Sequence, residues 1–339
     1  MATNTSSFPL RHSRDNTLQN TVPFDEKNDG KLRNTSVQFK NCRGRIPSIN
    51  ASRLRTMYLE AKDDPTSIVA AVCTYDGLSS RLAEEAGFPY IFLAGYAMSS
   101  SLGLPDAGYI GFQDVASIIQ ETVRQVSLPI MVDGDTGYGS SMNTKRTVEG
   151  FALSGAAGVM IEDQVAPKRC GHTKGKQVVG RAEAFSRMQA AVDARNQGVD
   201  IVILARTDAL IVSYEEAIFR AKKFVEIGAD IIFIEALPNK EAMKGAIRDV
   251  PAPVMLNNLE GGLTEELSAK QLAEMGFAAV SYPLTCVAAK IKSLRKAFTN
   301  LKDSFKHAAP PPILIFAEVC EGVGFNRYWE EERKYAVDS

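Results

Sequence analysis

Short runs of apolar residues recur along the chain after Ala51, and amphipathic segments of helical length separate most of them. Each run is continuously apolar, which is typical of strands buried on both faces of a parallel sheet. The runs are 68–73, 90–93, 129–133, 158–162, 200–204, 230–235, 253–256 and 278–282. We expect helices in the segments between them, for example at 182–195 and 214–227. Eight strands alternating with helices predict an α/β fold, a (β/α)8 TIM barrel, with a doubly wound open sheet as the alternative.

The beginning of the chain has a different composition from the middle. Residues 1–50 are rich in Asn, Ser, Thr, Arg and Lys and have no helical or strand periodicity, which predicts a disordered N-terminal arm. We expect the catalytic barrel to span residues 51–305 and a C-terminal helical extension to span residues 306–339. Arg11 and Arg14 lie in a stretch without acids, as in a mitochondrial transit peptide, but acidic residues follow closely.

The overall composition excludes several classes of protein. The 39 basic and 40 acidic residues give a net charge of −1, so we expect neither a nucleic-acid partner nor a membrane partner. No apolar run approaches the roughly 18 residues of a membrane span. The five cysteines are scattered without a CxxC pair, which argues against disulfides and structural zinc. This pattern indicates a reducing compartment, so we expect a cytoplasmic protein, with a mitochondrial location as the alternative.

Polar residues follow the apolar runs at several points. They are Tyr75-Asp76, Gly95-Tyr96, Asp133-Gly134-Asp135, Glu162-Asp163, Arg206-Thr207-Asp208, Glu235 and Asn257-Asn258. In a (β/α)8 barrel the carboxyl ends of the strands share one face, and that face carries the active site. The pattern therefore predicts a catalytic site built from the strand ends.

Three acids at neighbouring strand ends predict a metal site. Asp133 and Asp135 follow the third run, and Glu162 ends the fourth. Carboxylates that converge repel one another unless they share a proton or a cation. Oxygen-only ligands favour Mg²⁺ or Mn²⁺ over zinc. The alternative is that one or two of these acids only cap helices.

Arg206, after the fifth run, is a candidate clamp for a substrate carboxylate, because its guanidinium group binds carboxylates with two hydrogen bonds. The alternative is an internal ion pair with Glu162 or Glu235. Asn257 and the hydroxyl groups of Ser281 and Thr285 are further candidate donors to substrate oxygens.

The segment 167–176 places one cysteine among basic residues, a histidine and glycines. Neighbouring positive charge lowers the pKa of a thiol, so we expect Cys170 to be a proton donor or a nucleophile with a lowered pKa. The glycines would let the loop close over a bound anion. A flexible basic loop with an incidental cysteine is the alternative.

Several motifs in this order resemble those of the isocitrate lyase and phosphoenolpyruvate mutase superfamily, in particular its carbon–carbon lyase branch. The motifs are Ile161-Glu-Asp-Gln164, Lys168-Arg-Cys-Gly-His172, Leu102-Gly-Leu-Pro-Asp106, Val132-Asp-Gly-Asp-Thr-Gly-Tyr-Gly139, Ala205-Arg-Thr-Asp-Ala209 and Ser281-Tyr-Pro-Leu284. The resemblance covers about residues 65–300 and is strongest to 2-methylisocitrate lyases and 2,3-dimethylmalate lyases.

This resemblance implies a Mg²⁺-dependent barrel that forms a homotetramer, in which paired subunits exchange a C-terminal helix. It implies that Asp133 binds the metal directly and that Asp135 and Glu162 act mostly through its waters. Cys170 would be the catalytic acid or base on a mobile lid. Lys168, Gly171 and His172 would lie on the same lid. With Cys170, the further catalytic residues would be Arg206, Glu162 and His172, and the substrate-binding residues would be Gly95, Tyr96, Asp106, Lys168, Gly171, Glu235, Asn257 and Pro283.

The expected activity is cleavage of a 2-hydroxy di- or tricarboxylate to an α-keto acid, pyruvate or glyoxylate, and a second carboxylic acid. One departure is Ala94, where the lyase branch usually has a serine that binds the keto acid; Tyr96 and Ser99 are candidate substitutes. The alternatives are an oxaloacetate acetylhydrolase, which typically has serine in place of Pro283, and an inactive barrel that serves as a binding protein. Phosphonate mutases and hydrolases generally lack the Cys-Gly-His loop.

Overall fold

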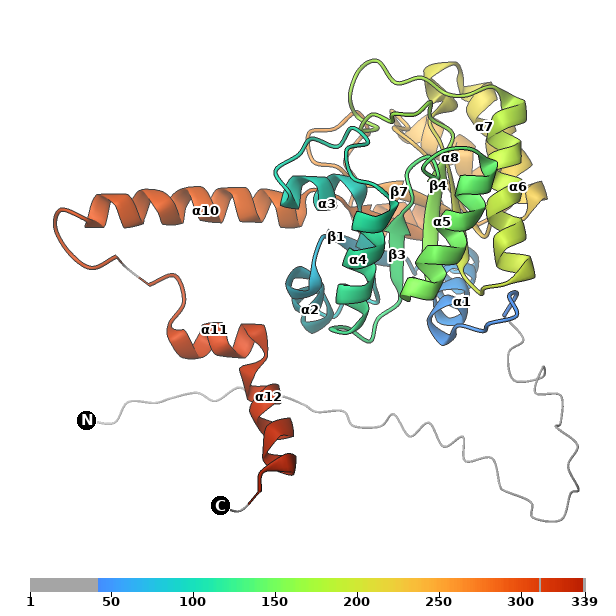
Figure 1. Ribbon diagram of the computed structural model, residues 1–339. Helices are drawn as coiled ribbons and strands as arrows, with labels where there is room; N and C mark the ends of the chain where they lie inside the picture. The colour runs from blue at the N-terminus through green and yellow to red at the C-terminus, as the bar shows by residue number, and fades with distance from the viewer. Residues whose placement is uncertain (1–41, 311, 338–339) are drawn as a thin grey trace, which may run out of the picture. The chain divides into compact units, whose positions relative to one another are not determined.

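Eight parallel strands form a closed barrel in a computed structural model, which describes residues 42–310 and 312–337 (Figure 1). Each strand pairs with the next, and the eighth pairs with the first, for example Val69 with Ala279. The strands are β1 (Val69–Thr74), β2 (Tyr90–Leu93), β3 (Ile130–Asp133), β4 (Gly158–Glu162), β5 (Val202–Thr207), β6 (Ile231–Ile234), β7 (Val254–Asn257) and β8 (Ala279–Tyr282). The predicted (β/α)8 barrel is confirmed, and the open sheet is excluded.

The described residues form twelve α-helices, and those that precede residue 276 lie around the barrel (Figure 1). They are α1 (Ile49–Asp63), α2 (Gly77–Glu85), α3 (Gly95–Ser101), α4 (Phe112–Val123), α5 (Ser141–Ser154), α6 (Arg181–Gln197), α7 (Tyr214–Ile227), α8 (Lys240–Asp249), α9 (Ala269–Met275), α10 (Thr285–Ser304), α11 (Phe316–Val323) and α12 (Phe325–Glu332), with short 3₁₀ turns at Ala209–Ile211 and Arg333–Tyr335. Helix α7 illustrates how particular residues determine where a helix begins and where it ends. The Ser213 side chain accepts a hydrogen bond from the Glu216 amide at its start, and Gly228, with a φ of 118°, ends it.

The continuous apolarity of the strands follows from their double burial. Every residue of β2 to β6 is buried, because one face of each strand packs inside the barrel and the other packs under the helices. In this arrangement the interior of the barrel is a packed core, and polar side chains collect where the strands end.

The chain begins to contact the barrel before residue 50, the predicted end of the arm. The Ile46 amide donates a hydrogen bond to the Gly198 carbonyl at 2.9 Å, and the Ile46 carbonyl accepts one from the Asp200 amide at 2.9 Å. Ser48 then caps helix α1, which starts at Ile49. Residues 1–41, which make up most of the predicted arm, lie outside the described residues.

A buried ion cluster joins α1 to the barrel. Arg55 of α1 contacts Asp200 at 2.8 Å and Asp230 at 3.2 Å, and all three side chains are almost fully buried. Arg195 contacts the other oxygen of Asp230 at 2.5 Å. Arg43, whose side chain is 45% exposed, contacts Asp230 at 3.2 Å. The cluster therefore contains a buried and an exposed arginine at the same distance from one carboxylate oxygen.

Helix α10 contacts α3 and β1, and α11 contacts α12. Within residues 42–310 and 312–337, no helix is both long enough and apolar enough to cross a membrane.

We predict that Arg55→Ala lowers the free energy of unfolding by about 3–5 kcal/mol, because it removes the arginine that neutralises the buried Asp200 carboxylate, whereas Asp230 keeps Arg195. Arg43→Ala is the matched control and should cost about 1 kcal/mol or less, since water screens an exposed pair. Urea unfolding followed by circular dichroism measures both values. Equal losses for the two variants would contradict the assigned role of burial.

Candidate active site

The strand ends bring the predicted polar residues together at one mouth of the barrel. A cavity of about 50 Å³ lies there. Its lining includes the predicted residues Tyr96, Asp106, Asp133, Cys170, Gly171, His172, Arg206, Glu235, Asn257 and Pro283. The other predicted residues, Gly95, Asp135, Glu162 and Lys168, contact members of this lining. The cavity is far smaller than the roughly 300–1,000 Å³ of ligand pockets. A substrate therefore requires the loop of residues 167–176, which lies over the cavity, to move away from it.

The Asp133 carboxylate is held by the backbone on both of its oxygens. It accepts hydrogen bonds from the Gly95 amide at 3.1 Å and the Asp135 amide at 2.9 Å. Gly95 must be a glycine, because a Cβ atom there would lie 2.8 Å from Oδ2 of Asp133. Asp135 itself has a φ of 48°, in the left-handed region that few non-glycine residues adopt. The chain therefore bends sharply to direct two acids to one place.

Lys168 lies between these acids. Its ammonium group is 2.6 Å from Asp106 and 2.8 Å from Asp135, and 4.0 Å from Asp133. Burial raises the pKa of Asp135 to about 7 against the opposing effect of Lys168. Burial alone would lower the pKa of Lys168, but Asp135, Asp133 and Asp106 raise it well above its usual range. The three acids therefore already bind one positive charge, the ammonium group of Lys168.

The donor set of this cluster fits a hard divalent cation. Asp133, Asp135 and Glu162 present carboxylate oxygens, and Oε1 of Glu162 is buried and makes no hydrogen bond within the described chain. The Lys168 ammonium group shows that a positive charge is favoured there. Among the residues that the structure describes, no three His, Cys, Asp or Glu side chains are already arranged around one point. A cation would therefore keep part of its coordination from water or substrate, as Mg²⁺ usually does.

Arg206 forms the internal ion pairs that the sequence left open as an alternative. Its guanidinium group contacts Glu162 at 3.1 Å and Glu235 at 2.8 Å, and it donates two hydrogen bonds to Asp208, at 2.8 and 3.2 Å. Burial alone would lower the pKa of Arg206, but Asp208 and Glu235 outweigh it, so the arginine stays charged. The three carboxylates fix the guanidinium plane at the floor of the cavity.

His172 faces the same network from the loop. Its Nε2 lies 3.1 Å from Oε1 of Glu235, and its Nδ1 accepts a hydrogen bond from the Leu263 amide at 2.9 Å. Because Nδ1 is an acceptor, the neutral ring carries its proton on Nε2, facing Glu235. Burial would raise the pKa of Glu235, but Arg206 and His172 lower it.

The expected lowering of the Cys170 pKa is wrong. Cys170 is half-buried, and burial raises the pKa of its thiol, with Asp106 and Glu235 adding to the shift. Two of the basic residues nearby are paired with acids: Lys168 with Asp106 and Asp135, and Lys176 with Asp208 at 2.7 Å. With its pKa raised, the thiol is protonated at neutral pH, a state in which it could donate a proton and is not a ready nucleophile.

The cysteine loop lies closed over the cavity. At Gly171, a Cβ atom would overlap Oε2 of Glu235 and lie 2.6 Å from Nη2 of Arg206, so the backbone rests directly on the ion network. The Gln164 side chain holds the base of the loop, because it accepts from the Arg169 amide and donates to the Arg169 carbonyl, both at 2.9 Å. The loop is in a closed position in this structure, whereas its mobility stays a prediction, and the sequence did not predict these contacts.

The remaining predicted residues have simpler surroundings. The Ser281 hydroxyl donates to Oδ1 of Asn257, which leaves the amide NH₂ of Asn257 to donate to a ligand. Ala94 and Tyr96 line the cavity, whereas Ser99 is buried in α3 and is not part of the lining. Of the two candidate substitutes for the missing serine, only Tyr96 reaches the site.

Sequence reasoning assigned no role to two contributors, although Asp208 was among the predicted strand-end residues. Asp208 orients Arg206 and binds Lys176 of the loop. Its place two residues after Arg206 at a strand end was a usable signal, because side chains two apart point to the same face of a strand. No local signal identified Lys176, which pairs with Asp208 across 32 residues.

A closed parallel barrel with acids, an arginine and a thiol at the carboxyl ends of its strands defines an enzyme of the (β/α)8 class. The family model described as phosphoenolpyruvate phosphomutase matches residues 59–302. The chain therefore belongs to the phosphoenolpyruvate phosphomutase family, which confirms the superfamily predicted from the motifs.

Known relatives refine this comparison. The chain is 40% identical to the 2-methylisocitrate lyase of Aeropyrum pernix over 227 residues, which cover 67% of this chain and 73% of that protein. It is 33% identical to the 2,3-dimethylmalate lyase of Eubacterium barkeri over 273 residues, which cover 80% and 94%. A solved structure of oxaloacetate acetylhydrolase with 3,3-difluorooxalacetate has a TM-score of 0.78 and 30% identity, covering 86% and 98%. The lyase names confirm the expected enzyme class.

We predict that Gly171→Ala opens the loop, because its methyl group overlaps the Glu235 carboxylate. An overlap of this kind costs about 1–3 kcal/mol, which raises the open population by about 5- to 150-fold. Limited trypsin digestion measures this opening, since Lys174 is exposed within the loop. Gly180→Ala is the control, because nothing lies within 4 Å of a Cβ atom there. Identical digestion of Gly171→Ala and the native protein would show that the loop does not rest on Glu235.

Proposed function

We propose that this protein is a carbon–carbon lyase that cleaves a 2-hydroxy di- or tricarboxylate to an α-keto acid and a second carboxylic acid. The observation that carries this proposal is the Cys170 thiol, which stays protonated and lines the same cavity as Arg206 and the acids of the strand ends. Cleavage leaves a carbanion that needs a proton, and a neutral thiol can deliver one. The names of the two lyase relatives support the same reaction.

The charge balance of the cavity supports a divalent cation, which we propose to be Mg²⁺, with Mn²⁺ as the alternative. Carboxylates outnumber cations there: Asp106, Asp133, Asp135, Glu162, Asp208 and Glu235 face Lys168, Lys176 and Arg206. A polycarboxylate substrate would add more negative charge to this surplus. Asp133, Asp135 and Glu162 would hold the metal, and when bound it would supply Lewis-acid stabilisation of negative charge on substrate oxygens.

Side chains of the protein bind the substrate and transfer its protons. Arg206 and the Asn257 amide bind substrate carboxylate and hydroxyl oxygens, after Arg206 gives up part of its contact with Glu162 or Glu235. One of these two carboxylates takes the proton of the 2-hydroxyl group as the carbon–carbon bond breaks. The α-keto acid forms on one side, and the electron pair stays on the other fragment as a carbanion conjugated with its carboxylate. Cys170 protonates that carbon, and solvent returns a proton to the thiolate.

The closed loop protects this intermediate. His172 and Lys176 tie the loop to Glu235 and Asp208, at 3.1 and 2.7 Å. A loop in this position excludes water, and water would otherwise protonate the carbanion without control. His172 acts by holding Glu235 and the loop, since its Nδ1 is already bound to Leu263.

A second candidate function is the hydrolysis of oxaloacetate to oxalate and acetate. The structural similarity to oxaloacetate acetylhydrolase favours it. Pro283 lines the cavity at the position where the resemblance places a serine in those hydrolases. A proline side chain cannot donate a hydrogen bond to a hydrated carbonyl group, so we place the lyase first.

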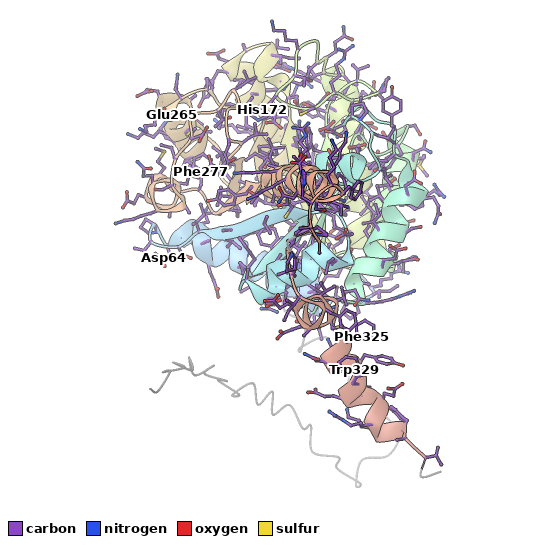
Figure 2. All side chains as sticks on the ribbon, turned by 90° about the vertical axis from the view of Figure 1, so that its left-hand side faces the viewer. Asp64, His172, Glu265, Phe277, Phe325 and Trp329 are labelled. Carbon is purple, nitrogen blue, oxygen red and sulfur yellow. The ribbon has the colours of Figure 1, made fainter. Side chains whose placement is uncertain are left out.

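We also propose that the chain forms a homotetramer in which C-terminal helices are exchanged. Large apolar side chains on these helices are exposed in the single chain, including Phe298 at 63% and Phe316 at 83%. Phe325 and Trp329 stand together on α12, with ring centroids 5.3 Å apart (Figure 2). Exposed apolar surface of this extent is typical of a surface that another chain covers.

A panel of acids with Mg²⁺ tests the proposed reaction. We expect cleavage of 2-methylisocitrate, isocitrate, dimethylmalate or another alkylmalate, with pyruvate or glyoxylate detected by NMR. Oxaloacetate should give little oxalate, because Pro283 offers no hydroxyl group. Oxalate as the main product would establish the hydrolase instead, and no turnover of any acid would support an inactive barrel.

We predict that Cys170→Ser lowers kcat by roughly 10²–10⁴, the usual contribution of a positioned acid, because a hydroxyl group is a far weaker acid than a thiol. The KM should change much less, since Arg206 and Asn257 hold the ground state. Cys286→Ser is the control, because Cys286 is also a half-buried free thiol with a raised pKa but does not line the cavity. A near-native kcat in Cys170→Ser would show that a group other than Cys170 donates the proton.

Removal of the metal site gives a further test. We predict that Asp133→Ala and excess EDTA each abolish turnover. Mg²⁺ should raise the melting temperature of the native protein, by about 2–4 °C for each kcal/mol of binding linkage, but not that of Asp133→Ala. Asp303→Ala, at an exposed position on α10, should keep the response to Mg²⁺. An unchanged melting temperature of the native protein together with full activity in EDTA would overturn the metal proposal.

A further inference from the structure

Tyr138 has a buried hydroxyl group that the proposed reaction does not use. The tyrosine lies in the turn between β3 and α5, and its ring packs edge-on against Phe151 of α5, with the ring centroids 6.2 Å apart (Figure 1). Its hydroxyl oxygen is buried and makes no hydrogen bond within the described residues. Burial of a hydroxyl group without a partner is unfavourable, so we expect a partner that is not part of the chain.

The backbone of this turn is held in an unusual conformation. Positive φ values occur at Asp135, Gly137, Tyr138 and Gly139, namely 48°, 87°, 60° and 144°. The Thr147 hydroxyl of α5 donates to the Gly137 carbonyl at 3.2 Å and holds the turn in place. A glycine at position 138 would adopt its φ readily, whereas the Cβ atom of a tyrosine disfavours it. The tyrosine side chain must therefore contribute something that a glycine cannot.

The packing of the ring explains an aromatic residue at position 138, but it does not explain the hydroxyl group. A phenylalanine would make the same contact with Phe151 and would leave no buried polar atom without a partner. The groups that surround the hydroxyl oxygen are therefore the ones that can account for it.

These groups are the acids that we assign to the cation. Burial raises the pKa of Tyr138 well above its usual range, Asp135 and Asp133 raise it further, and Lys168 opposes them. The hydroxyl group therefore keeps its proton and can donate it to an acceptor. Oδ1 of Asp135 contacts the Lys168 ammonium group at 2.8 Å. A carboxylate oxygen accepts about two hydrogen bonds, so this oxygen can accept another.

We propose that Tyr138 positions Asp135 in the cation site, through a water molecule that accepts a hydrogen bond from the tyrosine and donates one to the carboxylate. The hydroxyl group makes no direct hydrogen bond to Asp135, and polar groups in this relation are commonly joined by water. The inference rests on the proposed binding of a cation by Asp133, Asp135 and Glu162. Tyr138 is a positioning residue, since it does not line the catalytic cavity.

Tyr138→Phe tests this role, because it removes only the hydroxyl oxygen. The Kd for Mg²⁺, measured by titration calorimetry, should rise by about tenfold or more, the usual effect of losing a group that orients a metal ligand. The melting temperature without Mg²⁺ should not fall, since the ring keeps its contact with Phe151 and the chain loses no direct hydrogen bond.

Tyr58→Phe is the matched control. Tyr58 also has a buried hydroxyl group, but the causes of its raised pKa are burial and Tyr90 and include no acid. Removal of this hydroxyl group should leave the Kd for Mg²⁺ at its native value.

A spectroscopic measurement locates the effect at the tyrosine itself. A cation bound by the three acids changes the charge close to the Tyr138 ring, and the near-ultraviolet absorbance of a phenol responds to such a change. Mg²⁺ should therefore produce a tyrosine difference spectrum in the native protein and in Tyr58→Phe, but not in Tyr138→Phe.

The outcomes distinguish the role of Tyr138 from the cation site itself. A native Kd in Tyr138→Phe, or a difference spectrum that persists in this variant, would overturn the role of Tyr138 and leave the cation site in place. A lower melting temperature without Mg²⁺ at a native Kd would show that the hydroxyl group serves packing only, which also overturns the proposal. If the native protein binds neither Mg²⁺ nor Mn²⁺, the proposed cation site is wrong, and this inference is wrong with it.

Discussion

The interaction on which the site depends is the buried guanidinium group of Arg206. A buried charge is stable only when it is paired and hydrogen-bonded, and Arg206 satisfies this with Glu162, Asp208 and Glu235, which come from the ends of neighbouring strands. Two of these acids also hold the cysteine loop, through Lys176 and His172. The floor of the site and its cover are therefore parts of one ion network, and a change at either end alters the other.

The same loop controls the charge of the site. When it is closed, Lys168 lies within 2.8 Å of two acids, and the carboxylates are partly neutralised. Opening of the loop removes Lys168, His172 and Lys176 from their partners and leaves a strongly negative cup. Such a cup would attract a cation, in line with the divalent metal that we propose for this site.

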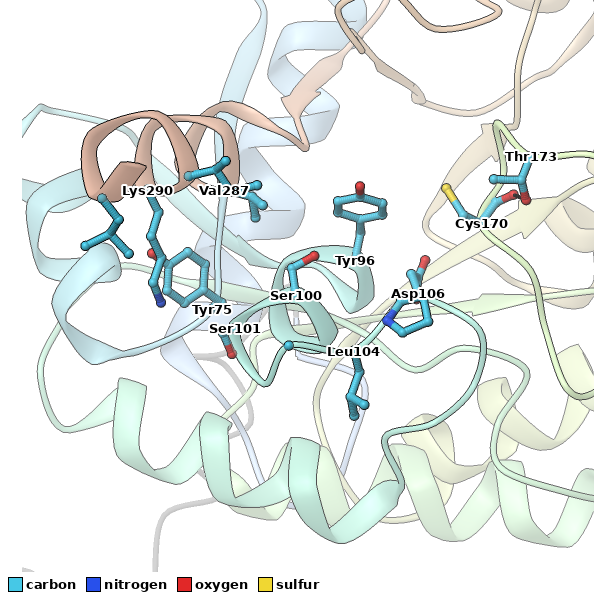
Figure 3. Close-up of a pocket in the computed structure, with 14 residues that line it drawn as sticks. Tyr75, Tyr96, Ser100, Ser101, Leu104, Asp106, Cys170, Thr173, Val287 and Lys290 are labelled. Carbon is cyan, nitrogen blue, oxygen red and sulfur yellow. Dashed lines mark hydrogen bonds between the residues drawn. The ribbon is translucent and has the colours of Figure 1, made fainter. Parts of the chain in front are cut away.

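The polar groups of the site and most of the apolar wall beside them come from different parts of the fold. The strand ends and the loop supply acids, an arginine and a thiol, and these set the chemistry. The cavity of about 700 Å³ under α10 is lined mainly by side chains of α3, α10 and the loop between α3 and α4, and it shares Tyr96, Asp106 and Cys170 with the catalytic cavity (Figure 3). A barrel enzyme can therefore change its substrate through the surrounding helices and loops while its strand ends stay the same.

The sequence by itself determined the barrel, the polar strand ends and the identity of most site residues. These features depend on local pattern: continuous apolar runs mark buried parallel strands, and the residues that follow them share one face. The direction of the Cys170 pKa shift, the partner of Lys168 and the role of Asp208 were decided only by the tertiary structure. Each depends on distances and burial between segments far apart in the chain, such as the 32 residues between Lys176 and Asp208. Basic residues near Cys170 in sequence lie in the fold beside acids, so burial, which no local pattern reports, sets the state of the thiol.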